Sequence, residues 1–206
     1  MIELLTANTP NGQKISIMLE EIGLEYKVTK ININKDDQFN PEFRKISPFS
    51  KIPVIKDGEI SVFESGAILI YLGEKSEKFY DKSERLTINQ WLMGQMAYVG
   101  PMLGQHHQFH HYNSGKSKFG EERYFRIAKR IYEDLDERLA QSKYLAGENY
   151  TIADIATFPW IARHEIHDIG LKNFKNLSRW YLDISKREAV IKGYDLLKRG
   201  EAVPRI

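Results

Sequence analysis

Three short polar stretches of this 206-residue sequence could together bind a small anionic or peptide ligand. The first is TPNG, residues 9–12, directly before an amphipathic segment that predicts a helix starting near Gly12. The unpaired N–H groups and the positive dipole end of that helix would favour a thiolate or another anion, and Thr9 and Asn11 would add a hydroxyl and an amide donor. The same four residues also make a good turn without any ligand.

The second stretch is FSKIPVIKDGE, residues 49–59, which predicts a β-hairpin. Pro53 cannot donate a hydrogen bond within a sheet, so the segment is either an edge strand or a bend with a cis Ile52–Pro53 bond. In the cis form the N–H and C=O of Ile52 would turn away from the sheet and could pair with the backbone of a bound peptide. Lys51 could bind a carboxylate.

The third stretch is FESGA, residues 63–67, in which Ser65 is placed to cap a helix. A helix N-terminus binds a carboxylate well, and Glu64 could bind an ammonium group. The pair therefore predicts a site for the head of an α-amino acid. The alternative is an ordinary N-cap that follows a strand.

The chain contains no cysteine, which excludes disulfide bonds, thiolate metal ligands and a thiol nucleophile of the protein itself. If the protein performs thiol chemistry, the sulfur must come from a ligand. A peptide with an amino-acid head, a backbone pair in its middle and a thiol at the first helix would satisfy all three stretches. Glutathione is such a peptide.

Composition and charge narrow the possible partners. Hydrophobic residues make up 42% and charged residues 28% of the sequence, as in ordinary globular proteins. The net charge is only +2 and the basic residues are scattered among acids, so we expect no nucleic-acid partner. No apolar run approaches the ~20 residues of a membrane span, and the first ten residues do not resemble a secretory signal. We therefore expect a cytoplasmic protein with no membrane partner.

The elements that must position the three stretches lie in the first third of the chain. Residues 1–76 alternate strand and helix signals in the order βαβαββα, with strands at 2–6 and 25–31 before a hairpin of PVI and ISVF. The first βαβ unit requires parallel strands and the hairpin is antiparallel, which is the thioredoxin-like α/β arrangement. We expect this N-terminal domain to bind the ligand.

From Ser83 onward only helical signals remain, so we predict an all-α domain over residues 83–206 after a linker at 77–82. One helix start is marked by Thr151 as N-cap and Asp154 three residues later, a variant of the capping box. The predicted helices cover residues 83–111, 117–142, 151–166, 174–187 and 188–198.

The motifs KIPV, ESGAI and GENYTIADIA occur in the order found in cytosolic glutathione transferases, which this chain resembles over nearly its whole length. Longer stretches, among them QFNPEFRKISPFSKIPVI and QWLMGQMAYVGPMLGQHHQF, are similar to the nu class, the bacterial glutathione-dependent disulfide-bond oxidoreductases. The resemblance implies the glutathione transferase fold, a glutathione co-substrate and a homodimer. The hairpin is shorter than in many nu-class relatives, so the rim of the site is expected to differ.

The resemblance also implies roles for individual residues. Thr9 and Asn11 match the polar pair near the glutathione sulfur and are the predicted catalytic residues. Ile52 would pair with the cysteinyl backbone, and Glu64 and Ser65 would hold the γ-glutamyl group. The full set of expected glutathione contacts is Asn11, Gln38, Lys51, Ile52, Pro53, Glu64, Ser65 and Arg123. The classes with an early catalytic tyrosine do not match this chain, whose first tyrosine is Tyr26 in the second strand.

These features predict a disulfide-bond reductase that uses the thiolate of bound glutathione. Two other functions remain open. The same thiolate could conjugate glutathione to electrophiles or reduce peroxides, and the fold could serve as a non-catalytic binding module.

The stretch GQHHQFHHY, residues 104–112, pairs His106 with His110 and His107 with His111 at helical i, i+4 spacing. It lacks the glutamate of HExxH and has no cysteine nearby, so a polar lining or a solvated face is favoured and no metal is predicted. A set of side chains in this region could line an apolar substrate cavity or simply pack between domains: Tyr98, Met102, Phe109 and Tyr112.

Overall fold

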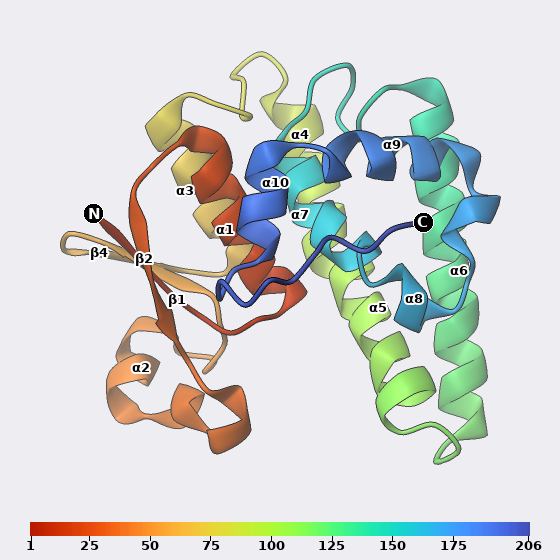
Figure 1. The fold of residues 1–206 in the computed structure, drawn as a ribbon, viewed down its shortest axis with the longest axis horizontal. Coiled ribbons are helices and arrows are strands. Elements are labelled where there is room, and N and C mark those ends of the chain that lie inside the picture. The colour runs from red at the N-terminus through yellow and green to blue at the C-terminus, as the bar shows by residue number, and fades with distance from the viewer. The chain divides into compact units, whose positions relative to one another are not determined.

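The computed structural model describes all 206 residues, which group by their contacts into two units (Figure 1). The N-terminal unit comprises residues 1–81 and 186–203, and the helical unit comprises residues 82–185 and 204–206. The boundaries expected from the sequence assign residues 186–203 to the helical domain, whereas their contacts lie with the N-terminal unit. No helix of the chain has the length and apolar character needed to cross a membrane.

A four-stranded mixed sheet forms the centre of the N-terminal unit. Its strands are β1 (Ile2–Thr6), β2 (Tyr26–Lys30), β3 (Val54–Asp57) and β4 (Ile60–Phe63), in the spatial order β2-β1-β3-β4. The β1–β2 pair is parallel, and the β1–β3 and β3–β4 pairs are antiparallel. This confirms the predicted thioredoxin-like arrangement.

Helices cover both faces of this sheet. Leu5 and Val54 are neighbours across the β1–β3 ladder and pack with Phe43 of α2 (Pro41–Ile46). Because successive side chains of a strand alternate between faces, Leu4 and Ile55 point to the opposite face. That face is covered by α1 (Pro10–Ile22) and α3 (Ser65–Ser76), which contact each other. Two short 3-10 turns, Ile33–Lys35 and Asp37–Phe39, link β2 to α2.

The last helix of the chain, α10 (Glu188–Tyr194), lies against α1, as Figure 1 shows. The absence of a side chain at Gly193 permits this approach, because a Cβ there would lie 2.5 Å from the Cα of Ile17. The Ser16 hydroxyl donates to the carbonyl of Gly193. The Arg187 guanidinium also holds both carboxylate oxygens of Glu21, at 2.6 and 2.7 Å. Residues 186–203 thus complete the N-terminal unit.

The helical unit begins with one long helical path from Arg85 to Tyr112, close to the predicted 83–111. It consists of α4 (Arg85–Gly94), a π-helical turn (Gln95–Val99), α5 (Gly100–His106) and a second π-helical turn (His107–Tyr112). The remaining helical elements are α6 (Lys118–Gln141), α7 (Ile152–Ile161), α8 (His164–His167), a 3-10 turn (Leu171–Asn173) and α9 (Lys175–Ser185).

Two helix boundaries differ from the prediction. The expected helix 151–166 is divided, because Ala162 and Arg163 separate α7 from α8, and the expected helix 188–198 ends at Tyr194. The predicted capping box at Thr151 and Asp154 is confirmed. Its buried carboxylate also accepts from the Leu145 N–H at 3.0 Å and the Trp180 indole at 2.9 Å, so the cap joins three segments of the unit.

Candidate functional site

The start of α1 differs from the prediction in one respect that matters for chemistry. The helix begins at Pro10 and not near Gly12, because Thr9 acts as N-cap and its side-chain oxygen accepts from the Gly12 N–H at 3.2 Å. Proline at the first helical position is favourable because its fixed φ suits the helix. Asn11 therefore lies in the first helical turn, where its position is fixed by the helix.

The start of α3 also corrects an expectation. Ser65 is not the N-cap but the first helical residue, and Glu64 occupies the cap position without a side-chain hydrogen bond to the helix. The backbone of Glu64 has φ 68°, which turns the end of β4 directly into the helix. The Ser65 hydroxyl accepts instead from the ammonium group of Lys14 on α1, at 3.3 Å.

The bond between Ile52 and Pro53 is cis, as the sequence suggested. The loop before it is held by Ser47, whose hydroxyl donates to the Lys51 carbonyl at 2.7 Å and accepts from the Lys51 N–H at 3.1 Å. Ladder pairing of β3 begins only at Val54. Ile52 is thus presented from a fixed loop outside the paired part of the sheet.

A cavity of about 130 Å³ collects these three chain segments in the N-terminal unit. It contains six of the residues expected to contact a ligand and adds two that the sequence analysis did not identify, Ser47 and Phe63. The lining residues are Asn11, Ser47, Lys51, Ile52, Pro53, Phe63, Glu64 and Ser65. Pockets for whole drug-sized ligands measure roughly 300–1,000 Å³, so this cavity suits one end of a peptide.

Three expected site residues lie outside the lining of this cavity. Thr9 serves the α1 cap, and the Gln38 amide lies in a 3-10 turn within 3.4 Å of the Ile33 carbonyl. Arg123 is an exposed residue of α6 in the helical unit, with its guanidinium 6.0 Å from the centre of the Tyr124 ring. The ligand contacts expected of these three residues stay predictions.

Lys14 is the residue beside the site that the sequence analysis missed. It is 1% exposed, and burial lowers the pKa of its ammonium group to about 7, opposed by the nearby carboxylate of Glu64. A signal for it exists in the sequence. Lys14 stands four residues before Met18, so it belongs to the apolar stripe of an amphipathic helix, where a charged residue is unexpected.

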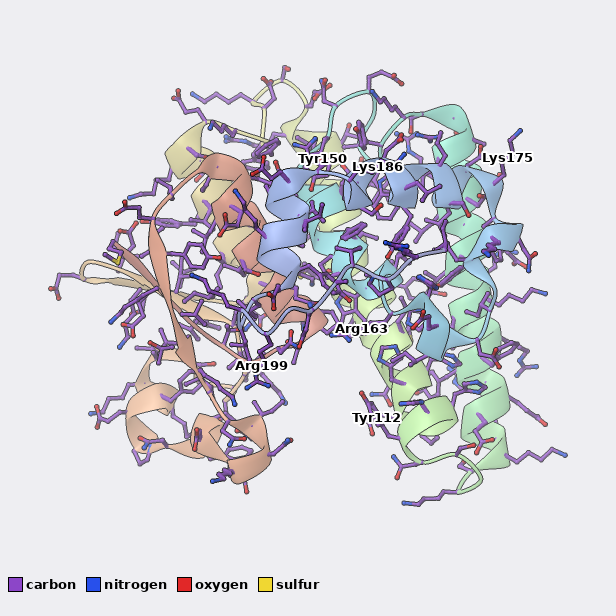
Figure 2. All side chains as sticks on the ribbon, in the orientation of Figure 1. Tyr112, Tyr150, Arg163, Lys175, Lys186 and Arg199 are labelled. Carbon is purple, nitrogen blue, oxygen red and sulfur yellow. The ribbon has the colours of Figure 1, made fainter.

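Two other hollows in the chain do not gather the expected site residues. The larger, about 800 Å³, lies in the N-terminal unit along β2 and the segment Leu196–Lys198, so it follows a sheet edge. The other, about 210 Å³ and mostly apolar, lies in the helical unit between Trp91 and Leu145. It includes only Tyr98 of the four side chains expected to share an apolar cavity, whereas Tyr112 extends outward and is 63% exposed (Figure 2).

All six histidines of the chain lie in the helical unit, and four form a group that we call the histidine stack: His106, His107, His110 and His167. The rings of His106 and His110 stack at 4.7 Å and those of His107 and His167 at 4.8 Å. His106 Nε2 donates to the His167 carbonyl at 2.8 Å. No three His, Asp or Glu side chains of the chain are arranged to hold a metal ion.

Burial lowers the pKa of His106, His107 and His167, so these three rings are neutral at pH 7. Burial is the largest cause that lowers the pKa of His107 to about 4. The neighbouring His106 and Arg163, the latter labelled in Figure 2, contribute to this lowering. The pKa of His167 falls well below its usual range for the same reason. Its Nδ1 lies 2.6 Å from the Tyr132 hydroxyl.

Two family models of known proteins match two different parts of the chain. Residues 2–74 match the family model for the glutathione S-transferase N-terminal domain, and residues 101–188 match the model for the C-terminal domain. The disulfide-bond oxidoreductase YfcG of Escherichia coli (strain K12) is 44% identical over 207 residues, which cover 96% of this chain and 95% of the relative. The chain belongs to the glutathione S-transferase family. The predicted family and the resemblance to bacterial disulfide-bond oxidoreductases are confirmed.

Solved structures of other members of the glutathione S-transferase family share the whole fold. A glutathione transferase from Pseudomonas putida, with one glutathione disulfide per subunit, matches with a TM-score of 0.88 and 38% identity, covering 95% of this chain and 91% of that one. One from Burkholderia graminis, with two glutathione molecules per subunit, matches with a TM-score of 0.89 and 37% identity, covering 97% and 89%. Those two proteins bind glutathione in reduced or oxidised form.

Proposed function

We propose that this protein is a glutathione-dependent disulfide-bond reductase in which the thiolate of bound glutathione replaces a protein cysteine. One observation carries the proposal: a chain without cysteine gathers Asn11, the Ile52–Pro53 loop and the start of α3 around a single cavity. The relationship to YfcG and the glutathione found in the related structures support it. We expect the protein to act in the cytoplasm, where thiols are kept reduced.

The peptide would be held by its two ends and its middle. Its γ-glutamyl head fits the small cavity, with the carboxylate at Ser65 and the start of α3 and the ammonium group at Glu64. Ile52 would pair with the cysteinyl backbone and Lys51 with a carboxylate. Gln38 and Arg123 are proposed as further contacts to the peptide.

The sulfur would then lie at the start of α1. The N-terminal N–H groups of this helix and its dipole favour a thiolate, and helix N-termini lower thiol pKa values from the usual 8.5 or so. Asn11 offers its side-chain amide as a donor. Thr9 accepts from Gly12 with its oxygen, which leaves the hydrogen of the hydroxyl to donate toward the sulfur.

The proposed reaction needs two glutathiones and no protein thiol. The first thiolate forms a bond to one sulfur of the substrate disulfide, and the other substrate sulfur leaves as a thiolate. A second glutathione thiolate attacks the glutathione sulfur of this mixed disulfide and releases the remaining substrate thiolate. The substrate gains two electrons and the two glutathiones become glutathione disulfide. The protein supplies orientation and stabilises the thiolate.

Conjugation of glutathione to an electrophile is the second candidate, because it begins with the same thiolate and related proteins are described as glutathione transferases. Peroxide reduction would use the same site. Rates with bis(2-hydroxyethyl) disulfide, 1-chloro-2,4-dinitrobenzene and cumene hydroperoxide, each with glutathione, separate these activities. The disulfide is expected to give the highest kcat/KM. Glutathione binding without turnover of any of the three would instead indicate a binding module.

Asn11→Ala tests the site directly. We expect it to lower kcat/KM for the disulfide about a hundredfold, which corresponds to about 2.7 kcal/mol of transition-state stabilisation. Asn34→Ala, at an exposed asparagine of the Ile33–Lys35 turn, serves as the control and should leave the rate unchanged. Equal rates for the two variants would remove Asn11 from the mechanism.

We also propose a homodimer, in which the N-terminal unit of one chain packs on the helices of another. Phe49 supports this proposal, since it is 69% exposed in the loop before the cis bond and contacts Phe63 edge-to-face with 6.3 Å between ring centres. Light scattering is expected to give twice the chain mass. Phe49→Ser should shift the equilibrium toward the monomer, and a wild-type protein that is monomeric at micromolar concentration would contradict the proposal.

A further inference from the structure

The burial of the Lys14 ammonium group requires a physical explanation. Lys14 lies in the second turn of α1, 1% exposed, beside the fully buried Ile15, Ile17 and Met18. Burial of a charge costs several kcal/mol in a real protein, so a neutral side chain would serve the core of the unit better. The position of Lys14 must therefore be explained by what its head group faces.

The head group of Lys14 lies beside a residue that lines the small cavity. Its Nζ lies 3.3 Å from the Ser65 hydroxyl oxygen, and Ser65 is one of the residues that line the cavity. An ammonium group only donates, so the Ser65 hydroxyl oxygen accepts from Lys14 in its charged form. Ser65 is also the first residue of α3, where N–H groups at the helix start favour a carboxylate.

We propose that Lys14 is a positioning residue that acts through Ser65, and that a ligand carboxylate bound at Ser65 makes Lys14 take up a proton. The inference rests on the proposed function, because the carboxylate is that of the γ-glutamyl head. It adds to that function a coupling between peptide binding and the charge of a side chain that is almost entirely buried.

The direction of the coupling follows from the charges around Lys14. Burial lowers the pKa of Lys14 to about 7, and the carboxylate of Glu64, at the start of α3, opposes this by favouring the protonated form. At pH 8 most free molecules therefore carry a neutral amine. An arriving carboxylate adds negative charge and raises the pKa, so a proton enters with the ligand. Below about pH 6 the amine is already charged and no proton is taken up.

Calorimetry with S-methylglutathione measures this proton, because the methyl group removes the titrating thiol. Binding heats at pH 8 in three buffers of different ionisation enthalpy give the number of protons taken up. We expect a substantial fraction of one proton for wild type and none for Lys14→Met. We also expect the dissociation constant of wild type to rise as the pH is raised from 6.5 to 8.5, and that of Lys14→Met to stay nearly constant.

Two further variants separate position from charge. Lys14→Arg keeps a charge that does not titrate, so it should bind without proton uptake. Lys51→Met removes an exposed lysine from the same cavity lining and should weaken binding while retaining the uptake. At pH 6.5, Lys14→Met should bind about tenfold more weakly than wild type, the change that one pKa unit of coupling represents. Thermal melts identify any variant that fails to fold.

The outcomes distinguish this inference from the proposed function. If wild type binds S-methylglutathione without proton uptake, or if Lys14→Met takes up as much as wild type, the role of Lys14 is overturned and the glutathione site stands. If wild type does not bind at millimolar concentration, the glutathione site itself is overturned, and the role of Lys14 with it.

Discussion

The N-terminal unit and the helical unit both enclose nitrogen bases, but in different surroundings. Lys14 lies against the wall of a cavity, with the Ser65 hydroxyl and the Glu64 carboxylate near its head group. His106 and His167 are fully buried among aromatic rings, main-chain carbonyls and the Tyr132 hydroxyl. A base next to a cavity can regain its charge when an anionic ligand arrives. A base enclosed by rings can regain it only if the surrounding structure opens.

The two regions should therefore respond to pH in separate windows. Both depress the pKa of a base in the folded chain, so the unfolded chain binds more protons and stability rises with pH in each case. For Lys14 this rise lies between about pH 7 and its ordinary value of 10.5. For His107 it lies between about pH 4 and 6.5. The windows do not overlap, so each unit can be examined independently.

The largest effect is expected from Lys14→Met at pH 7. The buried lysine destabilises the fold by about 4 kcal/mol there, the free energy of lowering a pKa from 10.5 to about 7, and methionine has a similar shape without the charge. Urea unfolding should show Lys14→Met to be more stable than wild type at pH 7, with a smaller difference at pH 9.5. Lys35→Met, at an exposed position, is the control. A less stable Lys14→Met would show that the charge is well compensated.

A smaller effect is expected from acid in the helical unit. Stability is fully present above pH 6.5 and falls as the pH drops toward 4, because the unfolded chain protonates first. His107 alone should account for about 2 kcal/mol at pH 5. His107→Phe should flatten the stability curve between pH 6.5 and 5, whereas His111→Phe, at an exposed position, should leave it unchanged. An identical slope in both variants would refute this explanation.

The smallest effect is expected from Tyr132→Phe. This change removes the hydroxyl that lies 2.6 Å from His167 Nδ1 and leaves a buried nitrogen without its partner. The expected loss is about 1–2 kcal/mol in urea unfolding. Tyr112→Phe, at a residue that is 63% exposed, should change stability by less than about 0.5 kcal/mol. A similarly small change for Tyr132→Phe would mean that ring stacking alone holds the histidine stack.

Much of the N-terminal unit is predictable because its signals are local. The apolar run of β1, the proline beside Ile52 and the turn residues after β3 each restrict the backbone within a few residues. The helix starts were less accurate. At α1 the proline already belongs to the helix, and at α3 the positive φ of Glu64 makes Ser65 helical, a conformation that sequence does not signal for a glutamate.

The features that sequence did not predict depend on contacts between distant residues. The sequence marks Lys14 only as a charged residue in an apolar helix stripe, and its partner Ser65, 51 positions later, is brought to it by α3. The histidine stack needs α8 beside the end of α5, which brings His167 to His107. The assignment of residues 186–203 depends on the fit between Gly193 and Ile17, which neither segment signals alone.

That last fit has a consequence for how the molecule is made. The sheet and α1 are synthesised early, whereas α10, which covers one side of α1, follows more than 160 positions later along the chain. During most of translation the apolar surface around Ile17 is therefore not covered by α10. Many nascent domains fold in order from the N-terminus, but this unit is completed only after α10 has been synthesised. The portion of this protein that is synthesised first is thus among the last to be finished.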